Sequence, residues 1–132
     1  MSYLIDSHVL IWAITNPGKL SSKVRNILEE GDNTILVSSI SFWEISLKYS
    51  LGKLDLNGIL PQQLPELATK TGFELIGLSP EESATYHQLE AKWHRDPFDR
   101  MLIWQAIQNN FIIISDDSHF ANYKSVGLKV MW

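Results

Sequence analysis

The stretch Tyr3-Leu4-Ile5-Asp6-Ser7-His8, near the start of the chain, decides the fold class. A short apolar run stops at a carboxylate, and a second apolar run, Val9 to Ile14, follows at once. Continuous apolar runs are typical of strands buried on both faces, as in parallel sheets covered by helices. The pattern predicts a buried strand followed by a helix, with Asp6 at the carboxyl edge of the sheet, where ligands bind in open α/β folds. Because Asp is also a favoured helix N-cap, the alternative is that Asp6 only caps the helix.

Predicted strands and helices alternate along the rest of the chain. Apolar runs predict strands at residues 34–38, 73–76, 111–115 and 128–132. Caps, proline positions and apolar spacing predict helices at residues 21–30, 39–51, 61–71, 79–93 and 96–107. Strands that alternate with helices imply parallel crossovers, so we expect a three-layer α/β/α domain.

The composition is that of a globular protein and limits the possible partners. The 132 residues are 45% hydrophobic and 20% charged, and we expect them to form one domain, residues 1–132. Cysteine is absent, which excludes disulfides and thiolate zinc sites. Neither a basic leader nor an apolar run near the ~18 residues of a membrane span is present, so we expect a cytoplasmic protein that does not enter a membrane. With a formal net charge of −4, the chain must bind any nucleic acid through local basic residues or bound cations.

Glu44 lies within the predicted helix 39–51. Three apolar residues surround it at helical spacing, namely Ile40, Leu47 and Leu51. This spacing predicts an apolar stripe, from which a purely structural glutamate gains little. Two structural alternatives remain open: a capping box with Ser41, or an i,i+4 pair with Lys48 worth only about 0.2–0.5 kcal/mol.

Two further groups of acids stand at the boundaries of predicted elements. Asp96 and Asp99 are three residues apart at a helix start, which puts both on one side of the first turn. Helix capping explains Asp96 fully but Asp99 only weakly. Asp116 and Asp117 directly follow the strand 111–115, where a turn or the cap of a short helix is the structural alternative.

The parallel topology places these acids at one edge of the sheet. Asp6 and the Asp116–Asp117 pair follow strands there, and the helices of Glu44 and Asp99 start from the same edge. Two carboxylates about 4 Å apart repel by about 4 kcal/mol at an effective dielectric constant near 20. Converging acids therefore take up protons or move apart unless a cation lies among them. Oxygen ligands favour Mg²⁺ or Mn²⁺ over zinc, and acidic sites with one or two such ions are typical of enzymes that hydrolyse phosphodiesters.

Four stretches of the chain carry a family resemblance: Leu4-Ile5-Asp6-Ser7-His8, Ser41-Phe42-Trp43-Glu44-Ile45, His94-Arg95-Asp96-Pro97-Phe98-Asp99-Arg100-Met101-Leu102-Ile103 and Ser115-Asp116-Asp117. They resemble the motifs of the PIN domain and, more closely, those of VapC-type toxins of bacterial toxin–antitoxin pairs. The match covers essentially the whole chain in the expected order. It implies a PIN-like fold with a central five-stranded parallel sheet, a Mg²⁺- or Mn²⁺-dependent endoribonuclease, a homodimer, and a cognate antitoxin protein that inhibits it.

Matched position by position, the resemblance implies a catalytic and metal-binding site of four acids: Asp6, Glu44, Asp99 and Asp117. Asp117 rather than Asp116 fits the hydroxyl-x-Asp pattern, with Ser115 as the hydroxyl residue. A second tier of site residues comprises Asp96, Ser115, Asp116, Ser7 and His8. Ser7 stands where the family often has threonine, so the hydroxyl is kept. His8 follows Asp6 closely and is expected to be a structural histidine, with orientation of a carboxylate or contact with substrate as the alternative.

Basic residues near the motifs are candidates for contacts with RNA phosphates, with solvated surface charges as the alternative. The candidates are Lys48, Arg95 and Arg100. Several large aromatic residues lie close to the same motifs: Trp12, Phe42, Trp43, Phe98 and Trp104. We expect them in the core or at a dimer interface rather than as base-stacking platforms.

Two other functions compete with RNA hydrolysis. A signalling receiver domain is also an α/β fold with an acidic Mg²⁺ pocket. Receivers resemble one another in an acidic pair after the first strand and a phospho-acceptor Asp after the third, where this chain has a single Asp and Gly77-Leu78, respectively. The other alternative is a catalytically silent PIN fold that serves as a binding module, against which the presence of all four acids argues.

Overall fold

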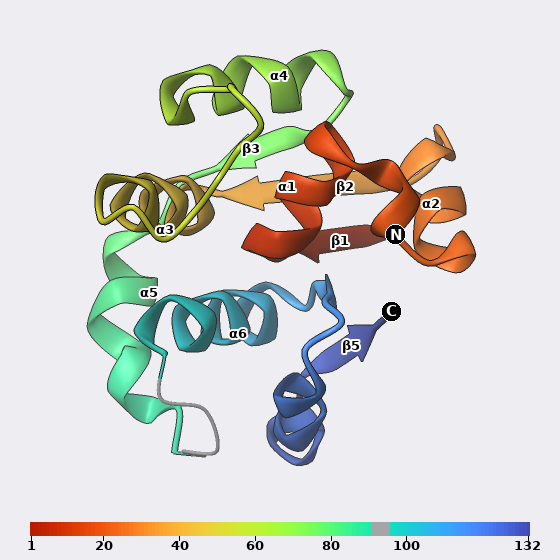
Figure 1. Cartoon of the computed structure of the whole chain (residues 1–132). Helices are drawn as coiled ribbons and strands as arrows, with labels where there is room; N and C mark the ends of the chain where they lie inside the picture. Colours follow the sequence, from red (N-terminus) through yellow and green to blue (C-terminus); the bar gives the residue numbers. More distant parts are fainter. Residues whose placement is uncertain (91–95) are drawn as a thin grey trace.

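A five-stranded parallel sheet lies at the centre of the computed structural model, which describes residues 1–90 and 96–132 (Figure 1). The strands are β1 (Ser2–Ile5), β2 (Thr34–Ser38), β3 (Glu74–Ile76), β4 (Ile112–Ile114) and β5 (Lys129–Met131). Their spatial order is β3-β2-β1-β4-β5, and every neighbouring pair is parallel. The predicted strands and the parallel sheet are therefore confirmed.

The first strand of the chain, β1, is the central strand of the sheet. Tyr3 of β1 pairs with Ile35 of β2, and Leu4 pairs with Ile113 of β4. Tyr3 and Ile5 point into one apolar cluster, whereas Leu4 points into a second cluster on the opposite face, as the alternation of side chains along a strand requires. Burial on both faces explains why this strand is an unbroken apolar run.

Helices cover both faces of the sheet, so the predicted three-layer α/β/α fold is confirmed. The α-helices are α1 (Ser7–Thr15), α2 (Ser22–Glu29), α3 (Ser39–Ser50), α4 (Leu64–Lys70), α5 (Pro80–Thr85) and α6 (Pro97–Asn109), and the short 3-10 helices are η1 (Pro17–Lys19), η2 (Pro61–Gln63), η3 (Tyr86–Gln88) and η4 (Ser118–Val126). Helices α1, α2 and α4 bury apolar side chains on one face, and α6 and η4 do so on the other. Within residues 1–90 and 96–132, none of these helices has both the length and the apolar character needed to cross a membrane.

The helix predicted over residues 79–93 is wrong in its second half. Ser79 begins it with a capping box, as the sequence indicates. The α-helix nevertheless ends at Thr85, and after η3 the backbone becomes extended at Leu89. Leu89 is buried, and its carbonyl oxygen accepts a hydrogen bond from a side chain of α6. This tertiary packing replaces a further helical turn, and residues 91–95 lie outside the described residues.

Candidate metal centre

The four predicted acids come from four segments that meet at the carboxyl edge of the sheet. Asp6 directly follows β1, and Asp117 closely follows β4. Glu44 lies in α3, which begins where β2 ends, and Asp99 lies in the first turn of α6. Parallel topology thus gathers residues that are far apart in the sequence at the end of the sheet where ligands bind in open α/β folds.

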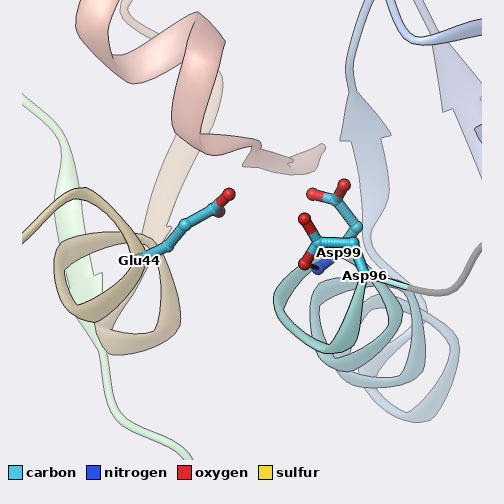
Figure 2. A group of neighbouring side chains, drawn as sticks. All are labelled: Glu44, Asp96 and Asp99. Atoms are coloured by element: carbon cyan, nitrogen blue, oxygen red, sulfur yellow. Dashed lines mark hydrogen bonds between the residues drawn. The ribbon is translucent and has the colours of Figure 1, made fainter. Parts of the chain in front are cut away.

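Glu44, Asp96 and Asp99 face one another between α3 and α6 (Figure 2). One carboxylate oxygen of each lies within 4.8 Å of the other two. Glu44 points from α3 toward α6 and is only 3% exposed, whereas the two aspartates come from the start of α6. The structure brings Glu44 and Asp99 together and adds Asp96, which the sequence placed in the second tier. We call these three residues the acidic cluster.

Asp96 caps a helix and belongs to the acidic cluster at the same time. Its Oδ1 accepts hydrogen bonds from the backbone N–H groups of Phe98, at 2.8 Å, and Asp99, at 3.3 Å. Its Oδ2 lies 3.9 Å from Nζ of Lys48. Capping therefore accounts for one oxygen of this carboxylate, and the other oxygen faces the cluster.

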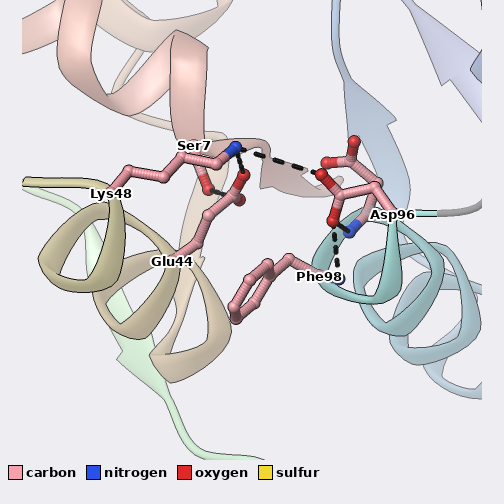
Figure 3. Close-up of polar contacts among 6 residues, drawn as sticks. Ser7, Glu44, Lys48, Asp96 and Phe98 are labelled. Atoms are coloured by element: carbon pink, nitrogen blue, oxygen red, sulfur yellow. Dashed lines mark hydrogen bonds and ion pairs between the residues drawn. The ribbon is translucent and has the colours of Figure 1, made fainter. Parts of the chain in front are cut away.

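Two polar side chains hold Glu44 in place (Figure 3). The hydroxyl of Ser7 donates a hydrogen bond to Oε1 at 2.6 Å, and Nζ of Lys48 contacts Oε2. The predicted pair of Glu44 with Lys48 is therefore present. The alternative capping box with Ser41 is wrong, because Ser38 is the N-cap of α3 and Ser41 is buried in the body of the helix.

The apolar stripe predicted around Glu44 is only partly correct. Ile40 is buried, as Glu44 is, but Leu47 and Leu51 are exposed. The second half of α3 projects beyond the core, since residues 46–51 are all exposed or partly exposed. Helical spacing alone does not reveal where a helix leaves the core.

Lys48 lies between the two sides of the acidic cluster (Figure 3). Its side chain is 36% exposed. Burial alone would lower the pKa of Lys48, but the hydrogen bond to Glu44 and the charges of Glu44, Asp96 and Asp99 raise it above the ordinary value. Lys48 is therefore charged at neutral pH and offsets part of the negative charge of the cluster.

Asp6 is buried at the end of β1 and caps α1, because its Oδ1 accepts a hydrogen bond from the backbone N–H of Val9 at 2.8 Å. Burial raises the pKa of Asp6 to about 6. A hydrogen bond with Ser115, the Val9 N–H and the nearby His8 lower that pKa, whereas the charge of Asp116 raises it. Ser115, Asp116 and His8 thus lie close enough to Asp6 to influence its charge.

Asp99 interacts electrostatically with Asp96 and with the other three acids of the predicted site. Burial raises the pKa of its carboxyl to about 8, together with the charges of Asp96, Glu44, Asp6 and Asp117. Asp6 and Asp117 do not belong to the group of oxygens within 4.8 Å of one another. Both lie within electrostatic range of Asp99, so the five acids form one electrostatic unit around this residue.

Asp117 caps η4 and contacts a histidine that the sequence did not indicate. Its Oδ1 accepts a hydrogen bond from the backbone N–H of His119 at 2.9 Å and lies 3.0 Å from the Nδ1 of the same residue. The hydroxyl of Ser115 accepts a hydrogen bond from the backbone N–H of Asp117 at 3.1 Å. The one available signal for His119 was the cap itself, since an N-cap carboxylate meets the first residues of its helix.

The three basic residues predicted to contact RNA have different outcomes. For Arg100 the prediction is wrong, because its guanidinium is buried and hydrogen-bonded within the protein. Its partners are the hydroxyls of Tyr86 (2.9 Å) and Tyr123 (3.0 Å) and the carbonyl oxygen of Leu89 (2.8 Å). Arg100 therefore ties α6 to η3 and η4. Arg95 lies outside the described residues, and the contact of Lys48 with RNA stays a prediction.

The aromatic residues near the motifs divide between core and surface. Trp104 is buried in α6, as expected for a core residue. Trp43 is exposed and packs edge-on against Phe98, with ring centroids 4.9 Å apart. Trp12 is half-buried and packs against Trp132 in the same manner.

The donor set of the acidic cluster fits a hard divalent cation. It consists of carboxylate oxygens alone, which suit Mg²⁺ or Mn²⁺ better than zinc. Two oxygens on opposite sides of one Mg²⁺ lie about 4.2 Å apart, twice the metal–oxygen distance. Oxygens within 4.8 Å of one another thus need only small side-chain shifts to share an ion. Burial and, after it, like-charge repulsion raise the pKa of Asp99, and a bound cation would relieve the repulsion.

A family model described as "PIN domain" matches residues 3–126. The chain therefore belongs to the PIN domain family.

Among curated relatives, Ribonuclease VapC22 of Mycobacterium tuberculosis is 25% identical over 129 residues, which cover 98% of this chain and 97% of the relative. Among solved structures, DNA-bound VapBC from Salmonella typhimurium aligns with a TM-score of 0.70 at 15% identity, over 99% of this chain and 97% of the other. A toxin–antitoxin complex from Klebsiella pneumoniae aligns with a TM-score of 0.63 at 17% identity, over 98% and 96%. At these identities the structural likeness concerns the fold.

Proposed function

We propose that this PIN domain, residues 1–132, is a metal-dependent endoribonuclease that acts as the toxin of a toxin–antitoxin pair. The observation that carries the proposal is the convergence of Glu44, Asp96 and Asp99 at the carboxyl edge of the sheet, within electrostatic range of Asp6 and Asp117. Membership of the PIN family and the similarity to Ribonuclease VapC22 support RNA as the substrate.

We assign the metal-binding and catalytic roles to Asp6, Glu44, Asp99 and Asp117, with Asp96 beside them. Mg²⁺ or Mn²⁺ held there would supply an activated water and would neutralise the charge that develops on the phosphate. The hydroxyls of Ser7 and Ser115 orient Glu44 and Asp6 through hydrogen bonds. Water adds at phosphorus and loses a proton, the bond from phosphorus to the 3′ oxygen breaks, and the leaving 3′ oxygen takes up a proton to become a hydroxyl.

The partners that we propose are a cognate antitoxin protein, single-stranded or loop RNA, and a second copy of this chain in a homodimer. The complex from Klebsiella pneumoniae, described as a toxin–antitoxin complex, supports the antitoxin. A short upstream reading frame that overlaps this one would support the toxin role further. Since cellular RNA is the proposed substrate, we place the protein in the cytoplasm.

The test is RNA cleavage by the purified chain with Mg²⁺ or Mn²⁺. We expect cleavage that EDTA abolishes and that Asp99→Asn lowers by more than the roughly 10- to 100-fold that loss of an outer-shell partner costs. Glu66→Gln is the matched control, because Glu66 is an exposed acid paired with Lys70 on α4, and it should leave activity unchanged. Full activity of Asp99→Asn in a preparation free of contaminating nucleases would overturn the site assignment.

Two observations distinguish the competing functions from the proposed one. A catalytically silent PIN fold should show no carboxylate-dependent binding of Mn²⁺ in calorimetry, whereas we expect binding that Asp99→Asn removes. The receiver alternative is wrong, because receivers have the strand order 2-1-3-4-5 and this sheet has the order β3-β2-β1-β4-β5.

A further inference from the structure

The acidic cluster contains a cation of its own, the ammonium group of Lys48. Nζ contacts Oε2 of Glu44 and lies 3.9 Å from Oδ2 of Asp96 (Figure 3). Glu44 and Asp96 also belong to the group of acids that can hold a metal ion. Lys48 and a divalent ion therefore compete for the same two carboxylates.

Lys48 cannot keep both contacts with these carboxylates once a divalent ion is bound to them. An ammonium and a divalent ion on the same oxygens repel one another twice as strongly as two single charges at the same separation. The side chain of Lys48 is a flexible four-carbon stem that is partly exposed. It reaches the cluster from the first exposed turn of α3, so it can move toward solvent without disturbing the core.

We propose that Lys48 is an exchangeable internal counter-cation of the acidic cluster. In the metal-free protein it neutralises Glu44 and Asp96, and it releases both carboxylates when a divalent ion binds. The inference rests on the proposed function for the metal site. It adds a role for Lys48 in the state of the protein in which neither metal nor RNA is bound.

Amine labelling measures the exchange without any readout of catalysis. The purified chain is acetylated briefly with an amine-reactive ester, and the modification of each lysine is quantified by mass spectrometry. Lys53 is the internal reference, because it is exposed and close in the sequence. In EDTA we expect Lys48 to react more slowly than Lys53. With saturating Mg²⁺ we expect the rate at Lys48 to rise by about 5-fold or more, while the rate at Lys53 stays constant.

Calorimetry on the same samples separates the possible failures. If Mg²⁺ binds and RNA is cleaved while Lys48 stays equally slow, the exchange is overturned and the proposed function stands. If no divalent ion binds, the exchange and the metal site of the proposed function are overturned together.

Variants at Lys48 test the competition directly. At one fixed pH, we expect Lys48→Gln to bind Mn²⁺ about 10-fold more tightly than the natural chain, because the competing charge is gone. Lys48→Arg keeps the charge and should bind Mn²⁺ with nearly the natural affinity. Lys70→Gln is the matched control, since it breaks the exposed i,i+4 pair with Glu66 on α4. Weaker or unchanged Mn²⁺ binding by Lys48→Gln would overturn the proposal.

Discussion

In three acidic residues of this protein, the side-chain carboxylate has two roles. Asp6, Asp96 and Asp117 each cap a helix through one oxygen, and each also lies in the electrostatic unit around Asp99. A backbone N–H group that binds one oxygen fixes the direction of the other. Capping thus holds these side chains in place before any ligand arrives, which is what a site of fixed geometry requires.

The substitution Asp96→Asn separates the capping role of this residue from its role in metal binding. Asn caps helices as well as Asp does, so Asp96→Asn should keep the stability of α6 and lower the affinity for Mn²⁺. Asp96→Ala loses the cap as well and should cost a further ~1 kcal/mol of unfolding free energy. Urea unfolding and Mn²⁺ calorimetry on both variants check this. Equal stability of the two variants would contradict the capping role.

Asp99 makes the stability of the metal-free protein depend on pH. Its carboxyl has a pKa of about 8 in the folded chain, against an ordinary value of 3.8. The folded state therefore binds more protons than the unfolded state between these values, and stability falls as the pH rises from about 4 to about 8. Asp6, with a pKa of about 6, adds the same sign over the lower part of this range.

Asp99→Asn should remove most of this dependence and raise the Tm at pH 8 by several degrees in EDTA. Saturating Mn²⁺ should stabilise the natural chain at pH 8 far more than the variant. Thermal unfolding at pH 5 and pH 8 provides the measurement. The same pH dependence in both proteins would show that Asp99 is not the titrating group.

At the scale of the elements, α6 is held in place by Arg100. Its guanidinium donates to two tyrosine hydroxyls and one carbonyl oxygen from η3, η4 and the segment after η3. This helix also carries Asp96 and Asp99, so the buried network fixes the position of one side of the acidic cluster.

Arg100→Met should destabilise the protein by about 2–4 kcal/mol, because each buried polar group left unpaired costs about 1–3 kcal/mol and repacking recovers only part of this. Lys124→Met, at an exposed lysine of η4, should stay within about 0.5 kcal/mol of the natural chain. Urea unfolding measures both variants. Unchanged stability together with loss of RNA binding would restore Arg100 as an RNA contact.

The elements that sequence reasoning predicts well are those governed by local chemistry. Strands β1, β2 and β4 contain short apolar runs between polar residues, and the caps at Ser79 and Asp96 mark helix starts without help from the rest of the fold. The end of α5 depends instead on the burial of Leu89, and the exposure of Leu47 depends on where α3 leaves the core. Such tertiary packing leaves no local pattern in the sequence.

At the scale of the whole molecule, the formal net charge of −4 limits how RNA is held. A single strand that contacts about two cationic side chains gives a slope of log affinity against log salt near −1.4. We expect a slope between about −1 and −2 for a cleavage-resistant RNA analogue, and loss of binding in EDTA. Fluorescence anisotropy over a salt series measures it. A slope steeper than about −4 would show extensive phosphate contacts instead.

Much of the site could be predicted because its aspartates follow strand ends or begin helices, and parallel topology brings such positions together. The remainder depends on side-chain partners from distant segments. Arg100 stands in the same motif as Asp99, yet it points into a pocket of hydroxyls that the sequence does not reveal. The spacing indicated the pair of Lys48 with Glu44, but nothing in the sequence indicated that Lys48 also approaches Asp96.

The central place of β1 also governs when the acidic cluster can assemble during synthesis. Among the five strands this one is synthesised first, yet one of its two neighbours, β4 (Ile112–Ile114), is the fourth to be synthesised. Until then β1 has an open edge, and α6 has no complete face against which to pack. A growing polypeptide that has not yet reached β4 therefore carries no assembled acidic cluster.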